Sequence, residues 1–272
     1  MPIIITPAYV LALALDQNNP HIAYQTWVRD RAPAAITVST ETAQGPKDAP
    51  LRPDTHEFWQ ADVLPATWVI DLGAAKDVDY VGIAGHTIGS SGATVKVEHS
   101  PDNIVWTDFA SDLAPVTDAP ILFLDVSLSR RYWRITLTGV GDPPKIAVIY
   151  IGEVLVVQRS IYGGHSPAVL SRDTTLYQNM SDGGQFLGQY VKRRGVNGRV
   201  SLRHLKAGWY RANFDPFVKA AREFPFFFAW RPVDWPLEVA YGWADADIRP
   251  SNMGIRDLMQ VNFDFKGVGY AD

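Results

Sequence analysis

The chain has 272 residues, 47% of them hydrophobic and 20% charged, which is enough apolar material to bury a substantial core. It contains no cysteine, and this excludes disulfides, thiolate metal ligands and cysteine nucleophiles. The net charge of −4 divides unevenly, because residues 1–157 carry a balance of −8 and residues 158–272 a balance of +4. With the Gly- and Pro-rich break in "VVQRSIYGGHSPAVLSRD", this asymmetry predicts two modules, 1–157 and 158–272.

The apolar start "MPIIITPAYVLALALD" is interpreted as an initial strand of the fold. No basic residue precedes this run, and the first one, Arg29, lies far beyond it, so a secretory signal is not expected. The run is interrupted by Pro7 and is too short to span a bilayer. We therefore expect a protein made in the cytoplasm that carries no signal peptide and does not insert into a membrane.

The segment "TWVIDLGAAKDVDYVGIAGH" (67–86) contains two apolar runs separated by a charged stretch. Trp68, Ile70 and Leu72 share one face of a strand, since side chains alternate along an extended chain. Gly73 is expected to end this strand, "AAKD" to turn, and "VDYVGIAG" to begin the next one. The segment is thus predicted to be a hairpin in which Asp71 fixes the turn by accepting backbone N–H bonds.

Short strands continue along the rest of the first half. "TVKVEHSPDN" alternates and then turns, "RRYWRITLTG" places Trp133, Ile135 and Leu137 on one face, and "KIAVIYIGEVLVV" is apolar enough to be buried on both faces. No long amphipathic helix separates these strands. The pattern predicts an all-β fold, a β-sandwich or jelly roll.

Four of these segments, "WVIDLGAAKDVDYVGI", "VKVEHSPDNIVWTDF", "RRYWRITLTG" and "IYIGEVLV", resemble in order the landmarks of discoidin-type domains, a galactose-binding-like jelly roll. The resemblance covers about residues 30–157. It implies a surface that binds glycans, lipid head groups or proteins through loops at one end. Candidate ligand contacts in such loops are His56, Trp59 and His86. The more frequent role of a Trp is core or turn packing, which we expect for Trp68, Trp106 and Trp133.

The second half is predicted to be β-rich with one short helix near 215–223, for which Asp215 is a suitable N-cap and Pro216 a suitable first residue. The final segment "MQVNFDFKGV" alternates, with Met259, Val261, Phe263 and Phe265 on one face. A strand–helix–strand–strand order with this ending resembles the tail-tube and distal-tail modules of long-tailed bacteriophages. That resemblance implies a β barrel or sandwich that assembles into a ring.

A basic run consists of Lys192, Arg193 and Arg194, with Arg199 close behind. Contact with nucleic acid is one interpretation, but the chain is acidic overall and no recognition helix accompanies the run. A solvated hairpin is the second interpretation. The third, which the ring resemblance favours, is a subunit interface at which these residues meet acidic groups of a neighbouring copy.

No catalytic set is recognisable. The six His are dispersed without zinc-binding spacing, and no nucleophile elbow or P-loop occurs, so no enzyme activity, cofactor or metal site is predicted. The function expected first is a structural virion protein at the distal tail of a phage or prophage. It would form a hexameric or trimeric ring with tube and hub proteins, and its sandwich would face outward toward host glycans. The alternatives are a stand-alone glycan-binding adhesin or lectin and an accessory module of a hydrolytic system.

Overall fold

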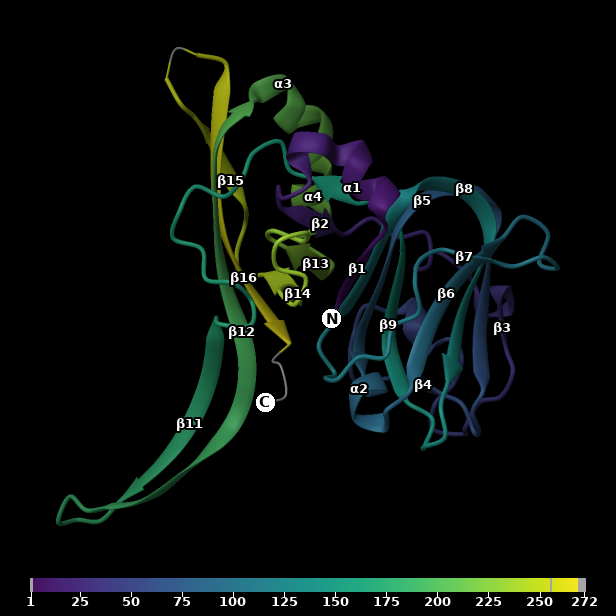
Figure 1. Cartoon of the computed structure of the whole chain (residues 1–272). Coiled ribbons are helices and arrows are strands. Elements are labelled where there is room, and N and C mark those ends of the chain that lie inside the picture. The colour runs from purple at the N-terminus through teal and green to yellow at the C-terminus, as the bar shows by residue number, and fades with distance from the viewer. Residues whose placement is uncertain (1, 255, 269–272) are drawn as a thin grey trace.

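A computed structural model describes residues 2–254 and 256–268, and in it two antiparallel-rich sheets stand side by side (Figure 1). The mainly-β prediction is confirmed. The first sheet has the order β4-β9-β5-β8-β6-β7, with β1 beside β8 and β3 beside β5. Its strands are β1 (Ile3–Ile5), β3 (Ile36–Val38), β4 (Trp59–Gln60), β5 (Ala66–His86), β6 (Thr94–Ser100), β7 (Thr107–Asp108), β8 (Ile121–Thr138) and β9 (Lys145–Gly152).

The second sheet has the order β10-β2-β13-β14-β16-β12-β11, with β15 beside β16. Its strands are β2 (His21–Ala23), β10 (Leu155–Val156), β11 (Arg172–Met180), β12 (Phe186–Lys206), β13 (Phe226–Ala229), β14 (Val239–Ala244), β15 (Arg249–Asn252) and β16 (Leu258–Val268). The helical segments are all short: α1 (Pro7–Leu13), η1 (Ala14–Asp16), η2 (Pro33–Ala35), η3 (Ala49–Leu51), α2 (Ile88–Ser91), α3 (Ala207–Trp209), η4 (Tyr210–Phe214) and α4 (Asp215–Ala220). None of the helices in the described residues is long and apolar enough to cross a membrane.

The first sheet folds over on itself into a sandwich because its two longest strands bend together. The first part of β5 pairs with the last part of β8, and the last part of β5 pairs with the first part of β8 and with β9. Trp68, Ile70 and Leu72 face inward from one layer, as predicted, and meet Ile83 and Ile149 of the other. A discoidin-like β-sandwich is therefore present.

The hairpin predicted at 67–86 is wrong. Both halves of this segment belong to one strand, β5, which pairs with β8 on both sides of an irregular stretch between Asp71 and Lys76. Asp71 does accept the backbone N–H of Gly73, at 2.7 Å, and it also takes two hydrogen bonds from Arg131 of β8, at 2.7 and 2.8 Å. The predicted acceptance of a backbone N–H by Asp71 is confirmed. The ion pair with Arg131 fixes this stretch as a bulge, at which the strand passes from one layer to the other.

The second sheet is covered on one face by a helical stretch formed by α3, η4 and α4. Its apolar side chains, among them Phe214, Phe217 and Val218, pack against Phe226 and Phe263 of the sheet. The predicted helix is real, but it begins at Ala207, so Asp215 lies within the stretch and is not its N-cap. The alternation predicted for β16 is confirmed, since Val261, Phe263 and Phe265 are buried.

The N-terminal run is only partly a strand. β1 lies parallel to β8, and the helix α1 follows it directly. Thr6 caps this helix by accepting the N–H of Tyr9 at 3.3 Å, and Pro7 occupies the first turn, where its missing N–H is not needed. The chain then crosses to the second sheet, where β2 is inserted between β10 and β13.

A third core joins the two sheets. It combines Tyr80 and Tyr150 on the outer face of the sandwich with Phe227 and Tyr241 of the second sheet. The Phe227 ring centroid lies 5.6 Å from that of Tyr150 and 4.9 Å from that of Tyr241. A Cβ at Gly82 would lie 2.7 Å from the Phe227 ring, so the absence of a side chain there allows the close approach.

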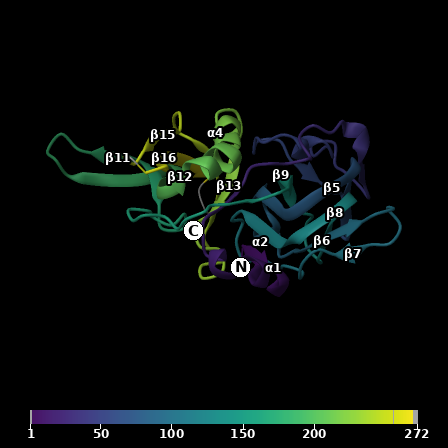
Figure 2. The same ribbon diagram turned by 90° about the horizontal axis from the view of Figure 1, so that it is seen from above.

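The predicted module boundary at 157/158 remains a prediction. Sheet membership changes slightly earlier, between β9, which ends at Gly152, and β10, which begins at Leu155. In addition, β2 connects the N-terminal segment to the second sheet. The view from above shows the sandwich and the second sheet side by side, where the third core joins them (Figure 2).

Because the third core is shared, we expect the two modules to unfold together. Phe227→Ala leaves a cavity between them and is expected to lower the free energy of unfolding by about 3–5 kcal/mol. Ile104→Ala is the control, since that side chain is 79% exposed and its loss is expected to change stability by less than about 0.5 kcal/mol. Urea titration followed by fluorescence measures both, and two separate transitions in the unaltered protein would contradict the shared core.

His21 in β2 makes stability depend on pH. Its buried ring has a pKa lowered from the usual 6.5 to about 4, mainly by burial, against the opposing hydrogen bond between Nδ1 and the Asn19 carbonyl. Since the folded-state pKa is depressed, the stability contributed by neutral His21 is present above pH 6.5 and is lost as the pH falls toward 4.

We expect the unaltered protein to lose up to about 3 kcal/mol more than His21→Gln between pH 7 and pH 4. Urea titrations at the two pH values measure this difference, in which the contributions of other groups cancel. His204→Gln removes an exposed ring and serves as the control. Equal losses for His21→Gln and the unaltered protein would show that His21 is not the responsible group.

Candidate functional site

The loops at one end of the sandwich form a continuous surface, opposite the bends of β5 and β8. Four segments meet there, 61–65, 87–93, 113–120 and 139–144, and we call them together the loop end. A Cβ at Gly89 would lie 2.3 Å from the Thr117 carbonyl oxygen, and one at Gly139 would lie 3.4 Å from the Leu64 side chain. These contacts place the four segments against one another.

The segment 41–57, between β3 and β4, runs beside the loop end and is held at several points by buried groups. Trp68 Nε1 donates to the Lys47 carbonyl oxygen at 2.9 Å, and Lys47 Nζ donates to that of Ile36 at 2.9 Å. Glu41 accepts the backbone N–H of Lys47 at 2.6 Å. The short helix η3, with Pro50 in its first turn, then turns the chain outward. The segment is long but ordered.

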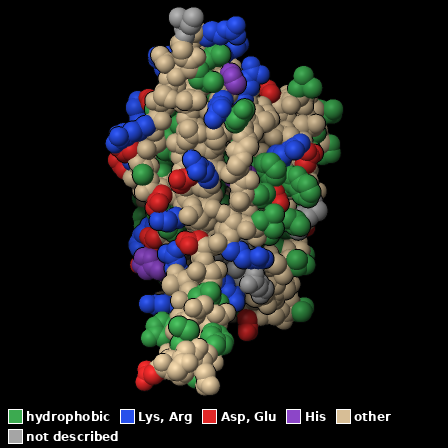
Figure 3. Space-filling model, turned by 90° about the vertical axis from the view of Figure 1, so that its left-hand side faces the viewer, with side chains coloured by type: hydrophobic (Ala, Val, Ile, Leu, Met, Phe, Trp, Pro, Cys, Tyr) green, Lys and Arg blue, Asp and Glu red, His purple; other side chains and the backbone are tan. Residues whose placement is uncertain are grey.

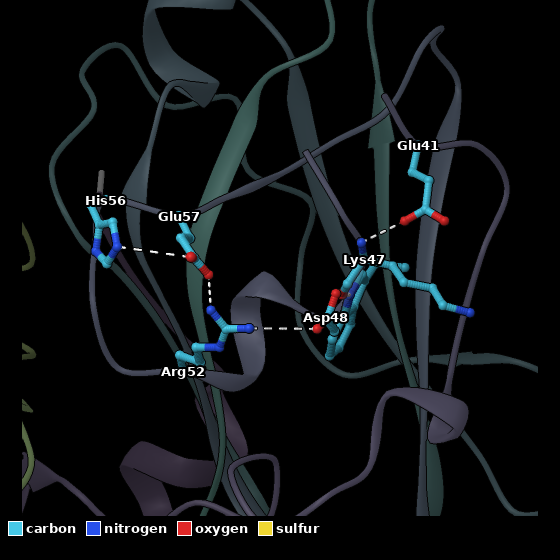
Figure 4. Close-up of polar contacts among 7 residues, drawn as sticks. Glu41, Lys47, Asp48, Arg52, His56 and Glu57 are labelled. Carbon is cyan, nitrogen blue, oxygen red and sulfur yellow. Dashed lines mark hydrogen bonds and ion pairs between the residues drawn. The ribbon is translucent and has the colours of Figure 1, made fainter. Parts of the chain in front are cut away.

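Five charged or titratable side chains project from this anchored segment: Asp48, Arg52, Asp54, His56 and Glu57. We call them the polar cluster. Figure 4 shows Arg52 between Asp48 and Glu57, with His56 directed toward Glu57. Arg52 forms an ion pair with Glu57, and its other terminal nitrogen lies 3.8 Å from Asp48. His56 Nδ1 lies 2.8 Å from Asp54 Oδ1.

The polar cluster combines donors and acceptors at the surface. The side chain of Arg52 is 50% exposed and that of His56 77% exposed, so both can reach a ligand. A guanidinium only donates hydrogen bonds, a carboxylate only accepts them, and a neutral imidazole does both. This mixture suits ligands that carry many hydroxyl groups, each of which donates and accepts.

Of the three predicted ligand contacts, only His56 is accessible. Trp59 is fully buried, with Nε1 directed to the Thr40 carbonyl oxygen at 3.3 Å. His86 is 3% exposed, and its Nε2 lies 2.8 Å from the Ala119 carbonyl oxygen. Trp59 and His86 both pair with Ile146 of β9, so these two residues lie together at one end of the sandwich. Trp59 and His86 are corrected to core residues, because burial removes them from any ligand.

Arg52, Glu57, Asp48 and Asp54 were not identified from the sequence. The available signal was the charge density of "PKDAPLRPDTHE", in which prolines limit regular structure while charged residues accumulate.

A second polar cluster lies on the outer face of the sandwich, but it is internally satisfied. Arg134 donates two hydrogen bonds to Glu98, at 2.7 and 2.8 Å, and Thr136 donates a third at 2.7 Å. Burial opposes ionisation of Glu98, yet these bonds lower its pKa below the usual value. Trp106 is covered by Arg134, whose guanidinium carbon lies 4.2 Å from the ring centroid. This arrangement stabilises the sheet and leaves few groups free for a ligand.

The predicted interface residues lie on β12. Lys192, Arg193 and Arg194 belong to the part that extends beyond the body of the second module, whereas Arg199 lies nearer the body. Arg193 pairs with Asp173 of β11 at 2.8 Å. Their assignment to a subunit interface remains a prediction.

The described residues contain no group of three or more side chains able to hold a metal ion. Two cavities of about 330 Å³ lie away from the polar cluster. One is bounded by Val116 of the sandwich and by Arg172 and Val196 of the second sheet, and the other by Tyr162, Arg199 and Arg203.

Comparison with solved structures finds matches that cover a little under half of this chain. Chitosan-binding module 1 from the chitosanase/glucanase of Paenibacillus sp. IK-5 is 13% identical, with a TM-score of 0.41 over 47% of this chain and 99% of that module. The CBM32 of AlyQ, solved with 4,5-unsaturated mannuronic acid, is 22% identical, with a TM-score of 0.38 over 47% and 96%. SpGH29 is 16% identical with a TM-score of 0.40, and the chain spans only 28% of its length.

No curated protein matches the chain. Nothing in these comparisons supports a phage tail module in the second half. A family model does match the sandwich, over residues 35–150, and it is that of the F5/8 type C domain, the discoidin type expected from the ordered strand landmarks. With two bent strands enclosing a Trp-rich core over the same range, residues 35–150 form an F5/8 type C domain.

Proposed function

We propose that this chain is a non-enzymatic glycan-binding protein that contacts its ligand through the polar cluster beside the loop end of its F5/8 type C domain. The observation that carries the proposal is the exposure of Arg52 and His56 on a segment anchored by buried Trp68. An anchored segment presents its side chains with little loss of conformational freedom on binding.

The chemistry of the polar cluster supports polar recognition without ring stacking. The nearest aromatic ring in sequence, Phe58, is half-buried, and Lys145 Nζ lies 4.3 Å from its ring centroid. Sugar hydroxyls would therefore be recognised by Arg52, His56 and the flanking carboxylates. A ligand with an acidic group would gain an additional charged contact with Arg52.

A ring-forming structural component of a phage tail, located in the virion, is the second candidate. The uneven charge of the two halves and the arm described in the next subsection favour assembly of several copies. The family match concerns the sandwich alone and favours binding. Glycan binding is therefore the function we adopt, and assembly is treated as a separate property.

Arg52→Ala and His56→Ala test the polar cluster. Each removes hydrogen bonds to a ligand and is expected to weaken binding about 10- to 100-fold, since hydrogen bonds to charged groups contribute about 1.5–3 kcal/mol. A broad glycan array identifies the ligand, and calorimetry with that glycan gives the affinities. Arg222→Ala, which removes a 59%-exposed arginine of the second module, is the control and is expected to bind normally.

Two results would contradict the proposal. Folded protein that binds nothing across the array would exclude the function. Glycan binding that is unchanged by both substitutions would exclude the site. Mass spectrometry of the glycan after prolonged incubation checks the non-enzymatic part, for which the expected result is full recovery of intact ligand.

A further inference from the structure

A long two-stranded ribbon projects from the second module. It consists of β11, the turn 181–185 and the part of β12 up to Arg194, and we call it the arm. In Figure 1 it extends downward, away from both cores, and Figure 2 shows it projecting on the side opposite the sandwich. Burial within β12 begins at Gly195, and only the base of the arm, at Val191 and Arg194, borders a cavity that it shares with Val116 of the sandwich.

The outer part of the arm carries large apolar side chains that have no cover within the chain. Figure 3 shows them gathered at the lower end of the molecule. Their exposed fractions range from 45% to 69%, and they are Leu176, Tyr177, Met180, Phe186, Leu187 and Tyr190. Tyr177 and Tyr190 face each other across the ribbon, with ring centroids 5.3 Å apart.

An isolated two-stranded ribbon is marginally stable in water, because neither face is buried. An exposed apolar cluster of this kind on a soluble protein marks an interaction site. The arm also leaves one edge of β11 unpaired, since the sheet ends at that strand. The arm is therefore built to be covered by another polypeptide surface.

The charge of the arm indicates which kind of surface covers it. Lys192, Arg193 and Arg194 follow directly on the apolar residues of β12, while the arm contains only Asp173 and Asp182 as acidic residues. Asp173 is already paired with Arg193. Lys192 has no ion pair within the part of the chain that the structure describes. A matching surface would be acidic and partly apolar.

The sandwich of the same chain provides such a surface at its loop end. Segments 61–65 and 139–144 contain Asp62 and Asp142, and neither segment contains Lys or Arg. Beside these carboxylates lie Val63, which is 57% exposed, and Val140, which is fully exposed. The two segments touch through Leu64 and Gly139, so the acidic and apolar groups belong to one patch.

We propose that the arm of one copy docks on the loop-end patch of a second copy, with Phe186 and Leu187 against Val63 and Val140 and with Lys192 facing Asp62 and Asp142. Arm and patch are different surfaces, so the contact is head-to-tail and a docked pair retains one free arm and one free patch, through which further copies can join. Repetition of this contact gives a closed ring or a chain. Several F5/8 type C domains in one assembly would bind a glycan-covered surface with increased avidity.

The first test measures mass without any glycan, so it does not depend on the proposed function. By sedimentation, we expect the unaltered protein to form oligomers with increasing concentration, and the double variant Phe186→Ser with Leu187→Ser to remain a 30.2 kDa monomer. The matched control is Ile104→Ser with Val105→Ser, which also removes two adjacent exposed apolar side chains, 79% and 63% exposed, at the opposite end of the sandwich. It is expected to assemble like the unaltered protein.

The second test mixes two defective variants. Asp62→Lys with Asp142→Lys places positive charge on the patch and is also expected to be monomeric. Mixed with the arm variant, it is expected to form a one-to-one complex, because one protein supplies an intact arm and the other an intact patch. Circular dichroism of each variant checks that it is folded.

Each outcome of the two tests either supports or overturns the docking proposal. An unaltered protein that stays monomeric at its highest soluble concentration overturns the proposal, and so does assembly that persists without the arm side chains. Loss of assembly in the arm variant with no complex in the mixture would overturn the head-to-tail contact, and self-association of the patch variant in that case would show that arms pair with arms. Arg52→Ala is expected to weaken glycan binding and to assemble like the unaltered protein. Unchanged glycan binding in this variant would contradict the binding proposal alone, and loss of its assembly would contradict the docking proposal alone.

Discussion

The structure depends on burial of both faces of β13. Phe226 and Phe228 point into the core beneath the helical stretch, whereas Phe227 points the opposite way into the sandwich. Three consecutive phenylalanines thus belong to two cores, and this short strand fastens the modules together. Tyr150 of the sandwich reinforces the contact, since its hydroxyl donates to the Pro225 carbonyl oxygen at 3.2 Å. Arg29 adds a guanidinium carbon 3.5 Å from the Phe224 ring centroid.

This attachment occupies one outer face of the sandwich and thereby decides which of its surfaces remain available. The face formed by Tyr80, Leu122 and Tyr150 is covered by the second module and does not contact solvent. Segment 113–120 of the loop end faces the second sheet across a cavity, and Tyr241 of the second module donates a hydrogen bond to the Pro53 carbonyl oxygen in segment 41–57. The side chains of Arg52 and His56 remain exposed. The proposed binding site therefore lies at the end of the sandwich, where anchored loops present Arg52 and His56.

The same attachment leaves the arm projecting. Helices cover one face of the second sheet and the sandwich covers part of the other. The sandwich reaches only the base of the arm, where Val116 and Val191 line one cavity, and the outer part of the arm is exposed. The core of the second module is buried, whereas the exposed apolar residues lie on the outer part of the arm. Substitutions on the arm are therefore expected to affect association more than folding. Under the two proposals, binding of ligand and binding of a second copy would use separate surfaces and could change independently.

The sequence by itself determined which residues form strands and which faces of those strands are apolar, because alternation at a period of two is a local property. It identified the inward face of Trp68, Ile70 and Leu72, the strand β16 and the F5/8 type C landmarks. Only the tertiary structure decided that 67–86 is one bent strand, since the pairing of Asp71 with Arg131 joins residues 60 positions apart. Likewise, only packing decided that Trp59 and His86 are buried while Arg52 is exposed, because burial depends on which distant segments cover a side chain.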